Sequence, residues 1–170
     1  MTAKKIVKKL LRGVLFKPYF KKRLSSCGLK LSVNHFSHIS KSAEVHIGDN
    51  CNINGLKILG KGRVTIGNNF HCGERFIIML GSHDYDTDEY VPYGNRVMFK
   101  EVIIGDNVWI GRDVVISGNV TIGEGAIASI RSVIVKDVEP CAIVGGNPAK
   151  TIKYRDKEHY FNLKQLNKVH

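Results

Sequence analysis

The chain has 170 residues, of which 43% are hydrophobic, and a formal net charge of +11. This length allows one well-buried domain and is short for two. No apolar run approaches the roughly 18 residues that a membrane-spanning helix needs. The four cysteines are too widely spaced for a zinc cage or a dense disulfide framework, so we expect no metal and a reducing, cytoplasmic environment.

Residues 1–26 form a strongly basic N-terminal segment. Eleven Lys and Arg residues precede Glu44, which is the first acidic residue of the chain. A helix over this segment is amphipathic, and its apolar face carries Val7, Leu10, Leu11 and Val14. Such a helix either packs on its own domain or, through residues 1–24, lies on an anionic membrane surface. No nucleic-acid-binding module accompanies the charge, so nucleic acid is not an expected partner.

A six-residue period organises residues 27–150. Aliphatic or small residues recur in one long series at Ile104, Ile110, Ile116, Ile122, Ala128 and Ile134. Earlier residues keep the same spacing, with a one-residue slip between the third and fourth of them: Ile47, Ile53, Leu59, Ile66, Cys72 and Ile78. Each hexapeptide predicts a short strand with its aliphatic residue pointing inward, and the Gly, Asn or Asp that follows takes a tight turn. Three hexapeptides make one triangular coil of a parallel β-helix.

Two segments lie outside this period. Residues 81–101 carry charges, tyrosines, Pro92 and Gly94 but no repeat, which predicts a loop that leaves the coil. Loops of this kind are frequent carriers of function. Residues 151–170 predict a short C-terminal helix that docks on the prism.

Four motifs in this pattern resemble a known family. They are SHDYD at 82–86, VIIGDNVWIG at 102–111, VTIGEGA at 120–126 and KDVEPCAIVGGNPAK at 136–150. Residues 66–155 are similar to the hexapeptide-repeat acyltransferases, and most similar to the maltose and galactoside, capsule and colanic-acid, and xenobiotic O-acetyltransferases. The resemblance implies an all-β, left-handed parallel β-helix. It also implies a homotrimer with active-site clefts between neighbouring subunits, and acetyl-CoA as the acetyl donor.

The resemblance assigns active-site roles to four residues. His83 of the SHDYD motif corresponds to the general base, because an imidazole can take the proton of the attacking hydroxyl near neutral pH. Its second ring nitrogen is expected to pair with a main-chain carbonyl or with a carboxylate such as that of Asp84. Asp84, Tyr85 and Trp109 are expected to line the acceptor cleft. The other histidines keep a structural or surface interpretation.

The late coils are expected to bind CoA. By motif alignment the residues are Arg112, Ser129, Ile130, Val135, Lys150, Lys153 and Arg155. The predicted function is transfer of acetyl from acetyl-CoA to a saccharide hydroxyl, in capsule, exopolysaccharide or other cell-surface glycan modification. An antibiotic acetyltransferase is one alternative. A non-catalytic β-helix scaffold is another, favoured by the bulky sequence ASIRS at 128–132, where relatives carry small residues.

Overall fold

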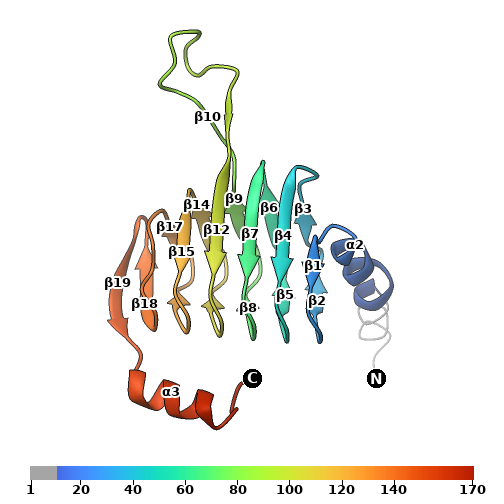
Figure 1. Cartoon of the computed structure of the whole chain (residues 1–170), viewed down its shortest axis with the longest axis vertical. Coiled ribbons are helices and arrows are strands. Elements are labelled where there is room, and N and C mark those ends of the chain that lie inside the picture. The colour runs from blue at the N-terminus through green and yellow to red at the C-terminus, as the bar shows by residue number, and fades with distance from the viewer. Residues whose placement is uncertain (1–10) are drawn as a thin grey trace.

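The computed structural model describes residues 11–170, which form a parallel β-helix with a protruding loop and a helical segment at each end (Figure 1). The strands stack as rungs of three sheets, so the predicted parallel β-helix is confirmed. Sheet A has the order β1-β4-β7-β12-β15, sheet B the order β19-β18-β16-β13-β8-β5-β2, and sheet C the order β17-β14-β9-β6-β3.

The strands are short, as the hexapeptide period requires. Those of sheet A are β1 Ser26–Cys27, β4 Ala43–Ile47, β7 Gly62–Ile66, β12 Lys100–Ile104 and β15 Val120–Ile122. Those of sheet B are β2 Ser32–His35, β5 Asn52–Asn54, β8 His71–Cys72, β13 Trp109–Ile110, β16 Ile127–Ala128, β18 Ala142–Gly146 and β19 Ala149–Tyr154. Those of sheet C are β3 His38–Ile39, β6 Leu56–Leu59, β9 Phe76–Met79, β14 Val115–Ser117 and β17 Val133–Ile134. All pairs in the three sheets are parallel except β18 with β19.

The core is the column of inward aliphatic side chains. Every member of the long series from Ile104 to Ile134 is at most 2% exposed. In sheet A, Ile104 stands between Ile66 and Ile122 of the neighbouring rungs. Identical side chains thus stack along the axis, and this removal of apolar surface from water is the main stabilising term of the fold.

The corners differ from the sequence-based expectation in the role of glycine. Gly67 and Gly105 follow inward isoleucines but do not take the left-handed conformation; a Cβ on Gly67 would lie 2.8 Å from the amide nitrogen of Asp106 in the next rung. The left-handed residue comes two positions later, at Asn69 (φ 53°) and Asn107 (φ 56°). Glycine is therefore required for close stacking of rungs, and asparagine, which tolerates the left-handed region, makes the turn.

The irregularity in the six-residue repeat also lies earlier in the chain than the sequence predicts. Ile58 is fully buried and pairs with Ile78, whereas Leu59, the residue in the six-residue series, is only partly buried. Gly55 has φ +90° at the preceding corner, and the inward position comes five residues after Ile53 instead of six.

Helical segments lie at both ends of the prism. At the N-terminal end the described part comprises a π-helix, η1 (Leu11–Phe16), and α2 (Lys17–Lys21), and Phe20 is fully buried against the first coil. The first ten residues of the predicted amphipathic helix lie outside the described residues. At the other end α3 (Lys157–Gln165) is capped at its N-terminus by Asp156, whose carboxylate accepts a hydrogen bond from the His159 amide at 2.9 Å. Within residues 11–170, no helix is long and apolar enough to cross a membrane.

Candidate active site

An antiparallel hairpin carries His83 away from the prism. Strand β10 (Ser82–His83) pairs with β11 (Val97–Met98), which places His83 opposite Val97. Two main-chain hydrogen bonds continue the pairing: the Asp84 amide donates to the Arg96 carbonyl at 3.1 Å, and the Gly94 amide donates to the Asp84 carbonyl at 2.8 Å. The loop at 81–101 is therefore an arm with internal hydrogen bonds, and it projects beyond the end of the sheets (Figure 1).

The His83 imidazole stacks on a tyrosine of the same arm. The centroids of the His83 and Tyr93 rings are 4.0 Å apart and the rings are inclined by only 18°. Among the described residues, no hydrogen bond reaches either ring nitrogen of His83, so the expected contact with Asp84 or a main-chain carbonyl is not formed. The ring is positioned by stacking, and both nitrogens remain available to other groups.

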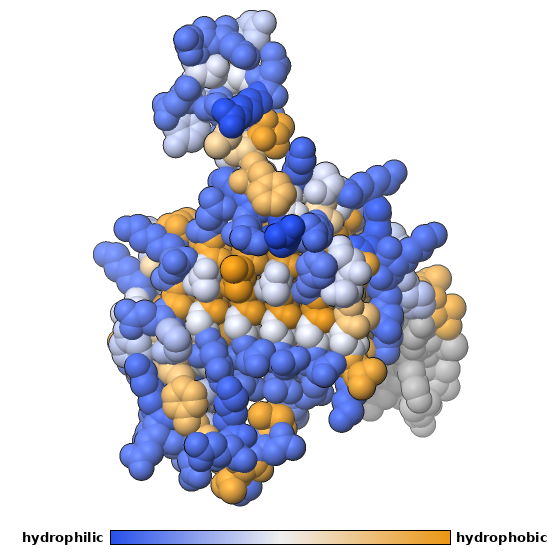
Figure 2. Space-filling model, viewed as in Figure 1, coloured by the Kyte–Doolittle hydropathy of each residue, from blue (hydrophilic) through white to orange (hydrophobic). Residues whose placement is uncertain are grey.

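The base of the arm combines polar and apolar surface. His83, Asp84 and Tyr85 line one hollow of about 270 Å³, together with Lys100 and Asn119 from the adjacent coils. Apolar side chains are exposed here as well: Met98 and Phe99, which also line this hollow, are 38% and 55% exposed, and the preceding Val97 is 48% exposed. Figure 2 shows this apolar patch below a loop tip that is mainly hydrophilic.

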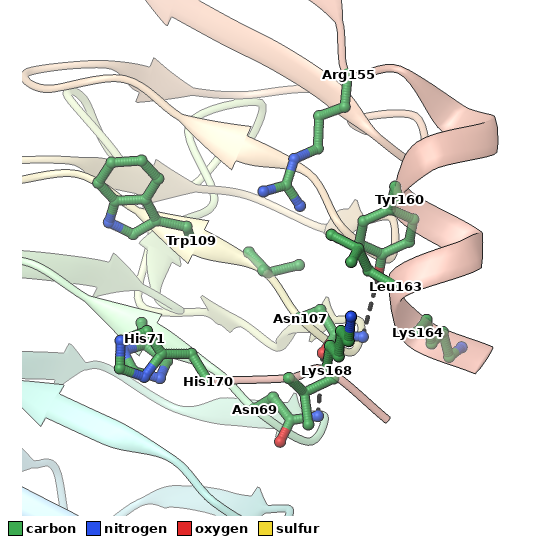
Figure 3. Close-up of a pocket in the computed structure, with 12 residues that line it drawn as sticks. Asn69, His71, Asn107, Trp109, Arg155, Tyr160, Leu163, Lys164, Lys168 and His170 are labelled. Atoms are coloured by element: carbon green, nitrogen blue, oxygen red, sulfur yellow. Dashed lines mark hydrogen bonds between the residues drawn. The ribbon is translucent and has the colours of Figure 1, made fainter. Parts of the chain in front are cut away.

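Trp109, the only tryptophan, lies in a different place. It is on the outer face of sheet B, is 55% exposed, and has His71 and Ile127 beside it on neighbouring rungs. Figure 3 shows that α3 and the residues after it pass in front of this face and leave a groove of about 370 Å³. Trp109 forms one side of that groove, and Tyr160 and Lys168 lie on the other.

A chain of hydrogen bonds fixes α3 to the corner of the prism. Asn69 donates to Asn107 at 3.0 Å, and Asn107 donates to the Tyr160 hydroxyl at 3.0 Å. The Tyr160 hydroxyl in turn donates to Glu124 at 2.9 Å, and Lys164 donates to the same carboxylate oxygen at 2.6 Å. Burial, followed by the hydrogen bond to Glu124, raises the pKa of Tyr160. The hydroxyl therefore stays protonated and keeps both contacts.

The segment after α3 reaches an early coil. The side-chain amide of Asn50 donates to the main-chain oxygen of His170 at 2.7 Å, and the centroid of the His170 ring lies 5.6 Å from that of the His71 ring. Neither of these two histidines stands in a motif, which is why the sequence predicts no functional role for them. Their shared groove arises from the return of the C-terminal segment, for which the local sequence holds no signal.

His83 and Trp109 lie on different sides of one chain. The arm leaves the prism between β9 of sheet C and β12 of sheet A, whereas Trp109 is on sheet B. The predicted cleft residues therefore form two groups: His83, Asp84 and Tyr85 share one hollow, and Trp109 belongs to the other groove. Within a single chain they do not make one site.

Comparisons with known proteins relate this geometry to enzymes. The family described as "Bacterial transferase hexapeptide (six repeats)" matches residues 101–127. Chloramphenicol acetyltransferase of Agrobacterium fabrum is 37% identical over 64% of this chain and 51% of its own length. Galactoside O-acetyltransferase of Escherichia coli is 32% identical over 73% of this chain and 62% of its own length. A solved structure of the hexapeptide-repeat acetyltransferase VCA0836 from Vibrio cholerae, complexed with acetyl-CoA, has a TM-score of 0.69 and 26% identity, covering 88% of this chain and 84% of that one.

The chain carries the hexapeptide repeat of this transferase family and is similar to hexapeptide-repeat acetyltransferases in sequence and fold. Its fold is the left-handed parallel β-helix that the resemblance implied. The chain spans about half the length of the Agrobacterium relative, so the match covers only part of that protein.

The residues that the acetyltransferase resemblance assigns to CoA are distributed over the late coils. Arg112, Ser129 and Ile130 lie at the corner between sheets B and C, Val135 follows β17, Lys150 and Lys153 are on β19, and Arg155 follows β19. Ile130 and Val135 are 61% and 43% exposed, which provides apolar surface. Arg112 differs from the others because it forms an ion pair with Glu74, and this pair holds the pKa of Glu74 below its usual range.

Arg155 is set apart from the other predicted CoA residues. It lines the groove beside Trp109, with its guanidinium 5.2 Å from the centroid of the Tyr160 ring and a 3.3 Å hydrogen bond to the Gly125 carbonyl. Lys150 and Lys153 do not line this groove. No group of three or more His, Cys, Asp or Glu residues between 11 and 170 is placed to hold a metal ion.

Proposed function

We propose that this chain transfers an acetyl group from acetyl-CoA to a saccharide hydroxyl, with His83 as the general base, in clefts between the subunits of a homotrimer. The observation that carries the proposal is the His83 arm: a hydrogen-bonded hairpin holds a stacked imidazole, with free ring nitrogens, at the base of the arm and outside the core of the prism. A residue held in that way is suited to act on a ligand bound to a neighbouring copy.

The chemistry needs no covalent enzyme intermediate. An unpaired ring nitrogen of His83 takes the proton of the acceptor hydroxyl as its oxygen attacks the thioester carbonyl. A main-chain N–H stabilises the oxyanion. The carbon–sulfur bond then breaks, and the imidazolium returns the proton to the departing thiolate of CoA. The products are the acetyl ester and the free thiol.

The late coils support CoA as the donor. The exposed side chains of Ile130 and Val135 provide an apolar surface for the pantetheine arm, and Lys150 and Lys153 provide charges for the phosphates. The same coils carry the bulky ASIRS segment, but Ile130 points into solvent and does not fill the core. The bulk that favoured a non-catalytic scaffold therefore lies on the outer surface, on the same coils as the proposed CoA site.

Trimer formation is supported by the outer face of sheet C. Ile77, Met79, Val115 and Val133 lie on that face, opposite the inward residues of the same strands, and the exposed Val135 follows β17 directly. A sheet with apolar residues on both faces is typical of one that is covered on both sides. Within one copy this outer face is only partly buried, and packing against neighbouring copies would cover it.

Antibiotic acetylation is a second candidate, favoured by the 37% identity to the Agrobacterium chloramphenicol acetyltransferase. One assay separates the two functions. Release of free CoA thiol is measured with acetyl-CoA and a panel of neutral and acidic oligosaccharides, chloramphenicol and a macrolide. The proposal predicts turnover that depends on an oligosaccharide. Turnover with only the antibiotics would support the second candidate, and failure of a folded trimer to bind acetyl-CoA would support a scaffold.

We also propose that the protein works in the cytoplasm, at the inner face of the membrane. In the described part of the N-terminal segment, Val14 and Leu15 are 65% and 55% exposed and are followed by Lys17 and Lys21. Apolar side chains beside lysines suit an anionic lipid surface. Sedimentation with anionic vesicles should be lost when residues 1–24 are deleted, and equal partitioning of both proteins would contradict the proposal.

A further inference from the structure

The groove between sheet B and α3 is lined by cations and aromatic rings. Arg155, Lys164 and Lys168 line it, as do the rings of Trp109 and Tyr160 and the imidazoles of His71 and His170. No Asp or Glu is among the lining residues of the described chain. The chain's overall charge excess lies before Glu44, so this local excess has a separate origin in residues 155–168.

Two of these cations are not neutralised by a partner. Lys164 pairs with Glu124 at 2.6 Å, and it points away from the groove in Figure 3. Neither Arg155 nor Lys168 has a carboxylate within 4.0 Å among the residues that the structure describes. Figure 3 shows Arg155 at one end of the space between Trp109 and α3, and Lys168 at the other. Arg155 has one hydrogen bond, to the Gly125 carbonyl, which leaves most of its five N–H donors free.

The position of Arg155 is fixed by its surroundings. Its guanidinium lies over the Tyr160 ring, and Tyr160 is itself held by Asn107 and Glu124. A preorganised guanidinium binds carboxylates and phosphates better than a mobile one, because less side-chain entropy is lost. The exposed face of Trp109 offers a flat apolar surface on the facing side of the groove.

We propose that this groove binds an acidic saccharide: one sugar ring lies against Trp109, and the carboxylate or phosphate of the saccharide is held by Arg155 and Lys168. The inference rests on the proposed function and names the class of its acceptor. It also moves Arg155 from the predicted CoA site to the acceptor side.

Intrinsic fluorescence tests the proposal, since Trp109 is the only tryptophan. The purified full-length chain is titrated with trigalacturonate, with a sugar phosphate, with the neutral trisaccharide galactotriose, and with CoA alone. We expect saturable fluorescence changes with an acidic saccharide, at least about 10-fold tighter than with galactotriose, because charge-assisted hydrogen bonds are the strong ones. Comparison of the first two ligands tells a carboxylate preference from a phosphate preference.

Two variants and a control define the role of the charges. Lys168→Gln changes an exposed side chain and should lower the affinity for the acidic ligand without changing that for galactotriose. Arg155→Gln should have the larger effect. Lys157→Gln removes an equal charge from α3 outside the groove, where Lys157 lies over the Tyr154 ring, and should leave binding unchanged.

The outcomes separate this inference from the proposed function. Equal affinity for acidic and neutral trisaccharides would overturn the acidic-saccharide site. So would a fluorescence change produced by CoA alone and lost in Arg155→Gln, since the groove would then hold CoA phosphates. Acetyl transfer to neutral sugars that is unaffected by both variants would overturn the inference and leave the proposed function standing. Selective binding of the acidic saccharide without any acetyl transfer would support the binding site and overturn the proposed function.

Discussion

The imidazole of His83 lies almost parallel to the phenol ring of Tyr93, with ring centroids 4.0 Å apart and an interplanar angle of 18°. The two residues are ten positions apart, and the turn between them is closed by the hydrogen bond from the Gly94 amide to the Asp84 carbonyl. The stack fixes the plane of the imidazole and leaves the edge that carries both nitrogens open. In the proposed mechanism, the orientation of the His83 base therefore depends on the aromatic ring of Tyr93 more than on the Tyr93 hydroxyl.

Replacement of Tyr93 tests that dependence. Tyr93→Phe keeps the ring and should leave kcat nearly unchanged, whereas Tyr93→Leu removes the stack and should lower kcat about 3- to 10-fold, the range that aromatic pair energies give. Steady-state kinetics with the best acceptor measures both effects, with acetyl-CoA binding as the control for folding. A loss in Tyr93→Phe as large as that in Tyr93→Leu would mean that the hydroxyl, and not the stack, matters.

Subunit mixing tests whether His83 serves a neighbouring copy. His83→Ala and Trp109→Ala should each be inactive alone. In mixed trimers, one cleft in about four combines an intact His83 from one copy with an intact Trp109 from another, so about a quarter of the wild-type rate should return. If mixtures made by co-refolding show only the sum of the two separate variants, both residues must come from the same copy.

Tyr160→Phe tests the connection between α3 and the prism. The substitution leaves Asn107 and Glu124 without their shared partner, at an expected cost of about 1–3 kcal/mol in local stability. Hydrogen exchange in residues 157–165 should accelerate, and the Trp109 emission should shift because the facing side of its groove loosens. Tyr154→Phe removes one exposed hydrogen bond, to Glu139, and is the matched control. Similar rates of hydrogen exchange in Tyr160→Phe and Tyr154→Phe would contradict the role of the Asn107–Tyr160–Glu124 hydrogen bonds in holding α3.

The raised pKa values of two buried thiols predict that the protein loses stability at alkaline pH. Burial raises the pKa of Cys51 from 9.0 to about 11 and that of Cys72 from 9.0 to about 12. A raised pKa in the folded state means that the folded protein holds the thiol proton more tightly. The stabilisation is therefore complete below pH 9.0 and is lost progressively as the pH rises through these higher values.

Two measurements check this prediction. The melting temperature should fall between pH 8.5 and pH 11, and Cys72→Ala should reduce the fall while lowering stability at neutral pH. In the native protein at neutral pH, iodoacetamide should label the partly exposed Cys27 long before Cys51 or Cys72. Rapid labelling of Cys72 would contradict this prediction, because it would show that the reagent reaches the core of the native protein.

The fold was largely predictable because each hexapeptide satisfies its own local rule. An aliphatic residue every six positions specifies the inward column, and from Ile104 to Ile134 the structure follows it without exception. The rule fails at Leu59, because the turn at Gly55 shortens one corner by one residue. Ile58 therefore takes the inward position in place of Leu59. The role of glycine was also misjudged: the constraint at Gly67 comes from the next rung, which lies 39 positions away at Asp106.

The candidate site was predictable only where a motif marks it. The motifs pointed to His83 and Trp109, but no motif indicates that the two residues lie on different sides of the prism within one chain. The stack on Tyr93 joins two residues that are ten positions apart in a segment with no repeat, so no periodicity predicts it. The groove beside Trp109 depends on contacts such as Asn50 with His170, which are 120 positions apart and leave no trace in the local sequence.

The most direct test of the account is the rate of acetyl-CoA consumption by wild type and His83→Ala, with the saccharide that gives the highest wild-type rate. His83 lies on an exposed arm outside the core, so the substitution should leave the fold and acetyl-CoA binding intact. We predict a fall in kcat of about 100-fold or more, in line with general-base contributions in other enzymes. A correctly assembled His83→Ala protein that turns over at the wild-type rate would contradict the account.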